Sequence, residues 1–231
     1  DSEGGVISFD QGTSPGLVDG AVHTVLSDSA RDRLLIGSRY GISAVDPFEG
    51  TASLHGLPSG MEMHTMMRWS PGDSDFLLIG SNLGFHCITL ESGLPVMDSM
   101  SDSDIGPVKN IFALQTGSGD LDLILFGQNS AVWTVTVMDQ GEDEDALVGE
   151  PEYNDAMADT LSGSNTEVNT ALHVPMEGRG PLLLVGTDAG LIAWNTTDGS
   201  ASAGDPWWVF DRDNAEDFVQ RADLLNVSKS A

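Results

Sequence analysis

The sequence predicts an all-β fold assembled from a repeated unit of short strands. Three observations support this expectation: an internal repeat, segments of strand length within it, and glycines at regular intervals. The repeat occurs four times along the 231 residues, and its centre is an apolar run ending in glycine, such as LLIGS at 34–38 and again at 77–81. These runs end at Gly37, Gly80, Gly127 and Gly186, which lie 43, 47 and 59 residues apart. Self-similarity at this period indicates a repeat architecture.

Each repeat contains the segments of four strands. The first segment reads VHTVLSD at 22–28, MHTMMRW at 63–69, VKNIFAL at 108–114 and VNTALHV at 168–174. The glycine-ended runs follow, and a third segment begins at once, at 41–46, 84–89, 131–136 and 190–195. Apolar and β-branched segments bounded by Gly, Asp, Asn or Ser are typical of strands, and runs without alternation indicate strands buried on both faces. A fourth strand is expected after each closing turn, at 51–57, 94–100, 146–149 and 207–210.

Four strands in about 45 residues is the pattern of a β-propeller blade. We therefore expect a propeller over residues 1–210, with four-stranded antiparallel blades at about 20–60, 61–104, 105–165 and 166–210. Residues 1–14 resemble part of a closing blade, because GVISFD at 5–10 matches the third segment, and residues 211–231 are expected to form an acidic tail or a closing segment. A five-bladed ring and part of a larger ring both stay open. No helix is expected before residue 211, and the acidic insert at 141–164 is expected to be flexible.

Two stretches resemble known families. Residues 16–50, which contain GLVDG, LLIGS and GISAVD, are similar to the propeller repeat in sensor domains of hybrid two-component regulators. Residues 190–210, GLIAWNTTDGSASAGDPWWVF, resemble the quinoprotein-type (PQQ-like) repeat. Both resemblances imply a propeller and disagree about its family. In the third repeat Ala131 replaces the glycine of the pattern.

Composition excludes several classes of function. The chain has 9 Lys and Arg residues against 36 Asp and Glu residues, a formal net charge of −27. This charge repels phosphate backbones, so nucleic-acid binding is excluded, and no stretch reaches the ~18 apolar residues that direct membrane insertion requires. The single cysteine, Cys87, rules out an intrachain disulfide. An acidic surface suits a halophilic or marine setting, and the start at Asp1 favours a segment of a longer exported precursor, placed in the periplasm, outside the cell or on its surface.

Candidate binding residues occur at two places in the repeat. His23 and His64 occupy the same position in the first segments of successive repeats, and Lys109 and Asn169 are their equivalents. First strands face the axis of a propeller, so these four could line a ligand site; the alternative is hydrogen bonding between blades. The turns between second and third strands carry the other candidates, which ordinary turn chemistry also explains: Arg39, Tyr40, Asn82, Asn129 and Asp188.

Calcium is the one cofactor that the sequence suggests. The candidate ligands are Asp211, Asp213, Glu216 and Asp217, because Ca²⁺ takes six to eight oxygen ligands. A solvated acidic tail explains the same residues without a metal.

The sequence favours a non-catalytic module that binds a protein, a glycan or a small ligand, as an extracytoplasmic sensor or a surface-protein domain. The alternative is a propeller enzyme, either a quinoprotein-like oxidoreductase or a glycan hydrolase or lyase. No catalytic residue is assigned, although Asp28 could act as an acid, and the sequence does not indicate an oligomeric state. Two close, buried carboxylates at the mouth of the channel would favour hydrolysis.

Overall fold

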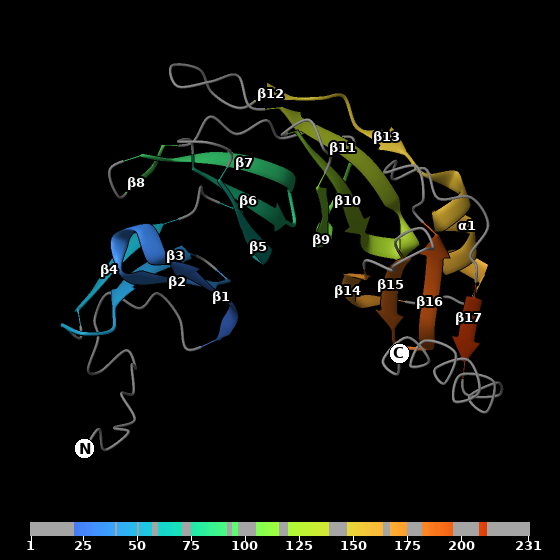
Figure 1. The fold of residues 1–231 in the computed structure, drawn as a ribbon, viewed down its shortest axis with the longest axis horizontal. Coiled ribbons are helices and arrows are strands. Elements are labelled where there is room, and N and C mark those ends of the chain that lie inside the picture. Colours follow the sequence, from blue (N-terminus) through green and yellow to red (C-terminus); the bar gives the residue numbers. More distant parts are fainter. Residues whose placement is uncertain are drawn as a thin grey trace, which may run out of the picture. The chain divides into compact units, whose positions relative to one another are not determined.

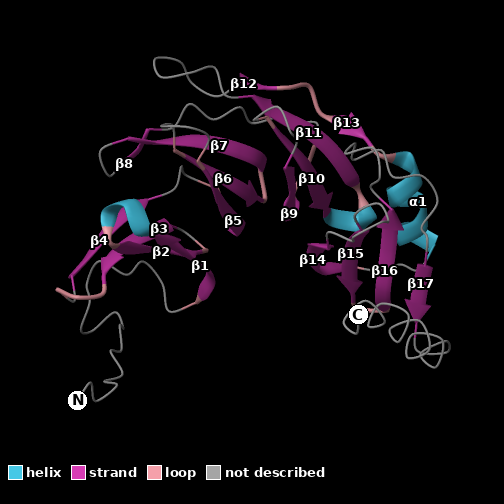
Figure 2. Cartoon of the chain, viewed as in Figure 1, coloured by secondary structure: helices cyan, strands magenta, loops and turns pink. Residues whose placement is uncertain are grey.

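The computed structural model describes residues 21–39, 41–49, 51–56, 60–70, 75–91, 94–96, 105–115, 120–138, 147–163, 167–174, 182–195 and 208–211. Almost all of the regular structure in these ranges is β-strand (Figures 1 and 2). The residues expected to close a ring, 1–14 and 212–231, lie outside the described residues. The chain divides into two compact units. The first consists of Asp1–Ile111 and Val137–Gly149, and the second consists of Phe112–Thr136 and Glu150–Ala231.

The strands form four sheets in which strands that are consecutive in the sequence are mostly neighbours. Sheet 1 contains β1 (Val22–Asp28), β2 (Arg33–Ser38), β3 (Gly41–Asp46) and β4 (Thr51–Gly56). Sheet 2 contains β5 (Met63–Trp69), β6 (Phe76–Ser81), β7 (Gly84–Glu91) and β8 (Leu94–Val96). Sheet 3 contains β9 (Val108–Gln115), β10 (Leu121–Gly127), β11 (Val132–Met138), β12 (Leu147–Val148) and β13 (Glu152–Tyr153), and β12 and β13 both pair with β11. Sheet 4 contains β14 (Val168–Val174), β15 (Leu182–Thr187), β16 (Gly190–Asn195) and β17 (Trp208–Asp211). Antiparallel four-stranded sheets of this order confirm the predicted class, an all-β fold of propeller blades.

The repeated glycines make room for neighbouring side chains. Gly37 pairs with Thr24 across β1 and β2, and a Cβ added to Gly37 would stand 2.7 Å from Thr24 Cγ2 and 2.6 Å from Cε of Met63 in the next sheet. At Gly80 an added Cβ would stand 2.8 Å from Cγ1 of Val108, which begins β9. The first residue of the first strand in one sheet, which we call its inner strand, therefore packs over the glycine of the preceding sheet.

Sheets 1 and 2 pack face to face through an apolar core. Leu35 and Ile42 from sheet 1 meet Leu77, Ile79 and Ile88 from sheet 2, and each is at most 2% exposed. All six residues of β6 are buried, which is why LLIG shows no alternation in the sequence.

Substitution of Gly80 by Ala tests this close approach. We expect the Gly80→Ala variant to lose about 1–3 kcal/mol of unfolding free energy, because one of the atoms that the new Cβ would meet is the Val108 carbonyl oxygen at 3.0 Å, which side-chain motion cannot move away. Gly186→Ala is the matched control, since its Cβ would stand no closer than 3.0 Å to Thr170 Cγ2 and 3.8 Å to the Thr170 carbonyl. Urea unfolding measures both. Equal losses in the two variants would contradict the packing argument.

Helix α1 (Asp155–Gly163) lies in the insert that the sequence predicted to be flexible, so that prediction is wrong for this part. Asn154 caps it, because its side-chain oxygen accepts a hydrogen bond of 3.1 Å from the Met157 backbone N–H. Met157 and Leu161 are fully buried in a core shared with strands of sheets 3 and 4, which include Phe126 and Trp194. The helix forms because these two apolar side chains, one turn apart, reach the same core.

The described part of the fourth strand is short in two sheets. β8 covers Leu94–Val96, and residues 97–100 of the expected strand lie outside the described residues. β12 is a two-residue strand at Leu147–Val148, where the sequence predicted a strand at 146–149. The third repeat also departs at its tight turn, where a 3-10 turn (Gln128–Ser130) with a left-handed Asn129 (φ 57°) replaces the hairpin of sheets 1, 2 and 4. This difference falls where Ala131 stands in place of glycine.

Candidate functional site

His23 and His64 occupy the same irregular point of their strands. The pairing of β1 with β2 shifts register between Val22 and Thr24, and the pairing of β5 with β6 shifts between Met63 and Thr65. The residue at each shift is left out of the regular ladder, and such a bulge redirects its side chain. His23 is exposed and His64 is half-buried. The repeat therefore presents an imidazole at the same point of two successive inner strands.

Lys109 stands at the equivalent point of β9, and its positive charge affects the pKa of His64. Burial lowers the pKa of His64 below its ordinary 6.5, and the positive charges of Lys109, His23 and Arg39 lower it further, while Glu62 opposes them. Charges influence a pKa in this way only when they lie near one another. We call His23, His64 and Lys109 the cationic cluster.

Arg39 and Glu62 flank the cationic cluster and join two sheets. Arg39 lies in the β2–β3 turn, and its Nη2 donates a 2.6 Å bond to Glu62 Oε2 before β5. The Arg39 carbonyl also accepts a 2.9 Å bond from the Met63 backbone N–H. Arg39 therefore serves both as a link between sheets 1 and 2 and as a charge next to His64.

Asn82 and Asp188 have structural roles in their turns. Asn82 Oδ1 accepts a 2.7 Å bond from the Glu62 backbone N–H, and its Nδ2 donates to the Gly60 carbonyl at 2.9 Å. Asp188 Oδ1 accepts a 2.9 Å bond from the Glu167 backbone N–H in the equivalent place. Both side chains hold the chain as it enters the first strand of their own sheet, as ordinary turn chemistry predicts.

Three of the remaining candidates belong to the second compact unit. Asn169 is exposed at the register shift of β14 and belongs to the second unit, as do Asn129 and Asp188. Tyr40 lies outside the described residues. Of the nine candidate binding residues, four therefore act on one another: His23, His64 and Lys109 of the cationic cluster, and Arg39.

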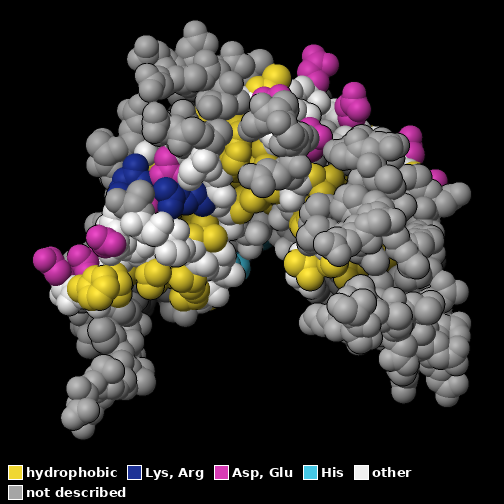
Figure 3. Space-filling model, in the orientation of Figure 1, with side chains coloured by type: hydrophobic (Ala, Val, Ile, Leu, Met, Phe, Trp, Pro, Cys, Tyr) yellow, Lys and Arg dark blue, Asp and Glu magenta, His cyan; other side chains and the backbone are white. Residues whose placement is uncertain are grey.

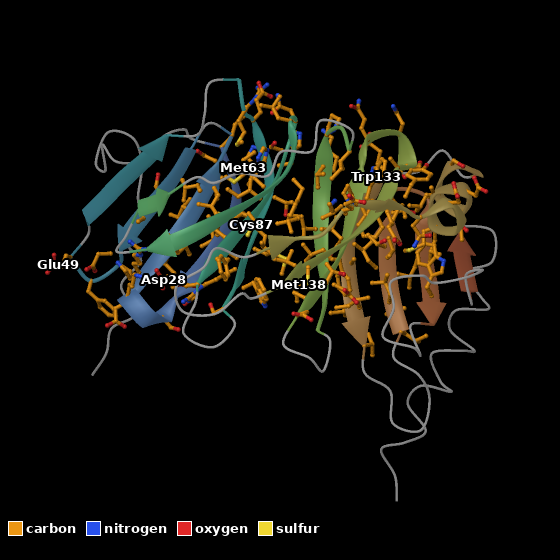
Figure 4. All side chains as sticks on the ribbon, turned by 90° about the horizontal axis from the view of Figure 1, so that it is seen from above. Asp28, Glu49, Met63, Cys87, Trp133 and Met138 are labelled. Carbon is orange, nitrogen blue, oxygen red and sulfur yellow. The ribbon has the colours of Figure 1, made fainter. Side chains whose placement is uncertain are left out.

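Sequence reasoning missed a buried ion-pair network between sheets 1 and 2. Asp28, at the end of β1, is fully buried, and its Oδ2 accepts from Arg33 Nε at 2.7 Å (Figure 4). Arg68 of β5 approaches Asp28 at 3.4 Å and binds Asp75 through two bonds of 2.6 and 2.9 Å. Arg31 bridges the same two carboxylates, at 3.3 Å from Asp28 and 2.8 Å from Asp75. On the face shown in Figure 3, the Lys and Arg side chains gather in one patch beside acidic side chains.

One signal in the sequence points to this network. Asp28 occupies the position that Trp69, Leu114 and Val174 occupy in the other repeats. A charge at an otherwise apolar position needs a partner, because an unpaired buried carboxylate is very costly. Arg31 and Arg33, three and five residues further on, are the nearest candidates.

The network gives its carboxylates a structural role. Burial alone would raise the pKa of Asp75, but hydrogen bonds from Arg68, Arg31 and Ser70 outweigh it and lower the pKa below the ordinary value. A general acid in glycoside hydrolysis needs the opposite shift. Asp28 and Asp75 therefore act here as anchors for arginines.

His86 forms a second buried polar site, in sheet 2. Ser81 Oγ accepts from the Leu83 N–H at 3.0 Å and donates to the Gly84 carbonyl at 3.2 Å, so His86 Nε2, 2.8 Å from Oγ, carries the proton that it donates. His86 is 1% exposed, and its Nδ1 has no partner among the described residues. Burial lowers the pKa of His86 to about 4. The ring is therefore neutral at physiological pH.

Of the four expected calcium ligands, one lies within the described residues. Asp213, Glu216 and Asp217 lie outside the described residues, and Asp211 is placed only as the last residue of β17. Among the described residues, no group of three or more His, Cys, Asp or Glu side chains is placed to hold a metal ion. In the same part of the chain, no helix is long and apolar enough to cross a membrane.

Comparison with known proteins gives remote likenesses in structure alone. No model of a protein family matches the chain, and no curated protein matches it. Among solved structures it is similar to BBS1N, crystallised in complex with ARL6DN (10% identity, TM-score 0.46, 78% of this chain and 64% of that one). It is also similar to the WD40 domain of SCAP from fission yeast (9% identity, TM-score 0.47, 84% and 43%). A third is the extracellular domain of BT3049 from B. thetaiotaomicron, described as a hybrid two component system (12% identity, TM-score 0.28, 90% and 41%). The chain spans less than two thirds of each of these structures, and likenesses this remote transfer neither ligand nor partner.

Proposed function

We propose that this chain is a non-catalytic binding module of the β-propeller class, and that its ligand binds at the cationic cluster. The observation that carries the proposal is that His23, His64 and Lys109 occupy equivalent points of β1, β5 and β9, where the charges of His23 and Lys109 act on the pKa of His64. The ligand is a small molecule, a glycan or a protein segment. A domain of an extracytoplasmic sensor or of a surface protein is the setting that fits the acidic composition best.

Two features of the cluster support binding over catalysis. Its side chains carry donors and positive charge on a rigid sheet edge, an arrangement that positions a ligand. The buried carboxylates Asp28 and Asp75 are held by arginines in the ion-pair network, at the other end of β1 and β5 from His23 and His64.

A ligand panel tests the proposal directly. The full chain would be screened against an array of neutral and acidic glycans and a library of small metabolites, with the His23→Gln/His64→Gln/Lys109→Met triple variant in parallel. We expect at least one ligand to bind the native chain and to lose most of its affinity for the variant. Turnover of a glycan by the native chain, or binding that is equal in both proteins, would overturn the proposal.

The electrostatic contact within the cluster has its own test. We expect the Lys109→Met variant to raise the pKa of His64, because the positive charge of Lys109 disfavours the imidazolium. Titration of the histidine C2–H resonances by NMR measures this shift. Lys229→Met is the control, since it removes the only other lysine of the chain and changes net charge equally. A His64 pKa that responds equally to both substitutions would show a general charge effect and no local contact.

A further inference from the structure

The cationic cluster differs from the rest of the described chain because every other described lysine or arginine forms an ion pair with a carboxylate. Arg31, Arg33 and Arg68 are bound to Asp28 and Asp75, and Arg39 is bound to Glu62. Among the residues that the structure describes, Lys109 is the one lysine or arginine without a carboxylate within ion-pair distance. Lys109 thus differs from the four described arginines, each of which has a carboxylate partner.

The local charge is opposite in sign to that of the whole chain. With neutral imidazoles, the groups that act on His64 carry a net charge of +1, because Lys109 and Arg39 are cationic and Glu62 is anionic. Protonation of His23 and His64 raises the local charge to +3, against −27 for the chain. At ~0.15 M salt the distant acidic residues are screened beyond ~8 Å, so this local charge governs a ligand that has reached the cluster.

Exposure permits access, and apolar surface adjoins the charge in the sequence. His23 and Lys109 are exposed. Val22, which precedes His23, is 54% exposed. Charged donors next to exposed apolar side chains suit an organic anion better than a hydrated ion, because the carbon skeleton of the ligand can cover the apolar groups.

We propose that the cationic cluster binds an oxyanion group, a carboxylate, sulfate or phosphate, carried by a small molecule or a sugar. Lys109 and the imidazole N–H groups donate charge-assisted hydrogen bonds to its oxygens. The inference rests on the proposed function and names the chemistry of its ligand. Binding also couples to protonation, since an anion favours a charged imidazole: affinity rises as the pH falls through the range below 6.5 in which His64, with its lowered pKa, takes up a proton. Glu62, Arg39 and Lys109 are the charged groups facing His64, and of these Glu62 alone favours its protonation.

Methyl glucuronide and methyl glucoside form a matched pair of probes, because they differ by the carboxylate. With the full chain and the histidine C2–H resonances as readout, we expect the glucuronide to shift His23 and His64 saturably and the glucoside to have no effect. Affinity for the glucuronide should fall about tenfold in Lys109→Met and stay within about twofold in Lys229→Met. It should rise about tenfold from about pH 7.5 to about pH 5.5. Inorganic sulfate, titrated alone, shows whether a free anion suffices: sulfate binding with the same dependence on Lys109 supports the oxyanion chemistry and identifies a free anion as its source.

Three results would overturn the anion proposal: equal shifts from both sugars, glucuronide binding that ignores Lys109, or no response to either the glucuronide or sulfate. These results are distinct from failure of the proposed function. A neutral ligand from the panel that binds the native chain and is lost in the triple variant leaves the binding module intact and removes the anion. Absence of any ligand that depends on the cluster removes both. In case Lys109→Met perturbs β9, His23→Gln is a second variant that removes one exposed side chain of the cationic cluster.

Discussion

The Asp28→Asn variant is expected to lose about 3–5 kcal/mol of unfolding free energy, the largest effect among the substitutions considered for this chain. Asp28 is fully buried, accepts hydrogen bonds from Arg31 and Arg33, and forms an ion pair with Arg68. Asparagine keeps the shape of the side chain but removes the negative charge, so Arg33 would lose its ion-pair partner and Asp75 would be the one carboxylate of the network left for Arg31 and Arg68. Urea unfolding at neutral pH measures the loss.

Asp32→Asn is the matched control, because it makes the same change in charge four residues away on an exposed residue. Asp32 has a left-handed backbone (φ 48°), which asparagine tolerates, so the expected change lies within about 0.5 kcal/mol. Arg39→Gln gives a second comparison, since its ion pair with Glu62 is half-exposed and pairs of that kind contribute about 0–1 kcal/mol. A loss at Asp28 no larger than at Arg39 would show that the network does not hold sheets 1 and 2 together.

Acid sensitivity due to His86 is the second large effect that we expect. The folded pKa is about 4 and the unfolded value about 6.5, so the unfolded chain binds the extra proton between these values and folding stability falls as the pH falls through this window. Above pH 6.5 the contribution disappears, because both states are neutral. The His86→Gln variant should therefore be less acid-sensitive than the native chain by about 3 kcal/mol between pH 7 and pH 4. Unfolding by urea at a series of pH values measures the difference.

Glutamine is the suitable replacement because its amide nitrogen can donate to Ser81 Oγ as His86 Nε2 does. Carboxylates across the acidic surface titrate in the same range, but they do so equally in both proteins, so the difference between the two curves isolates His86. Parallel curves for the native chain and His86→Gln would mean that His86 is protonated in the folded state.

The strands could be predicted from the sequence because their signal is local. Buried runs such as residues 77–80 are apolar without interruption, and Gly37 and Gly80 occupy equivalent positions in the first two repeats. Helix α1 could not be recognised with the same ease. Its two buried anchors, Met157 and Leu161, lie in an acidic insert, and the core that they cover comes from residues of sheets 3 and 4 that are distant in the sequence.

The candidate site also has one part that the sequence could predict and another that it could not. Repetition places His23, His64 and Lys109 at one point of three successive strands, so their proximity follows from the repeat. The ion-pair network depends on a contact between Arg31 and Asp75 across 44 residues, and no pattern within a single repeat encodes that pairing. The neutral state of His86 depends likewise on its burial, which its sequence neighbours do not show.

The packing of Met63 over Gly37 and of Val108 over Gly80 links the evolution of adjacent repeats. Each glycine leaves space for a residue that the next repeat supplies, so a change in size at one of the two positions requires a change at the other. Shuffling or duplicating one repeat would place a glycine against a residue of the wrong size. Exchange of the glycine-containing strand together with the first strand of the following repeat would preserve the packing. Recombination within this fold is therefore expected to succeed at breakpoints inside a blade, between its inner strand and the turn glycine, and to fail at the apparent boundaries between blades.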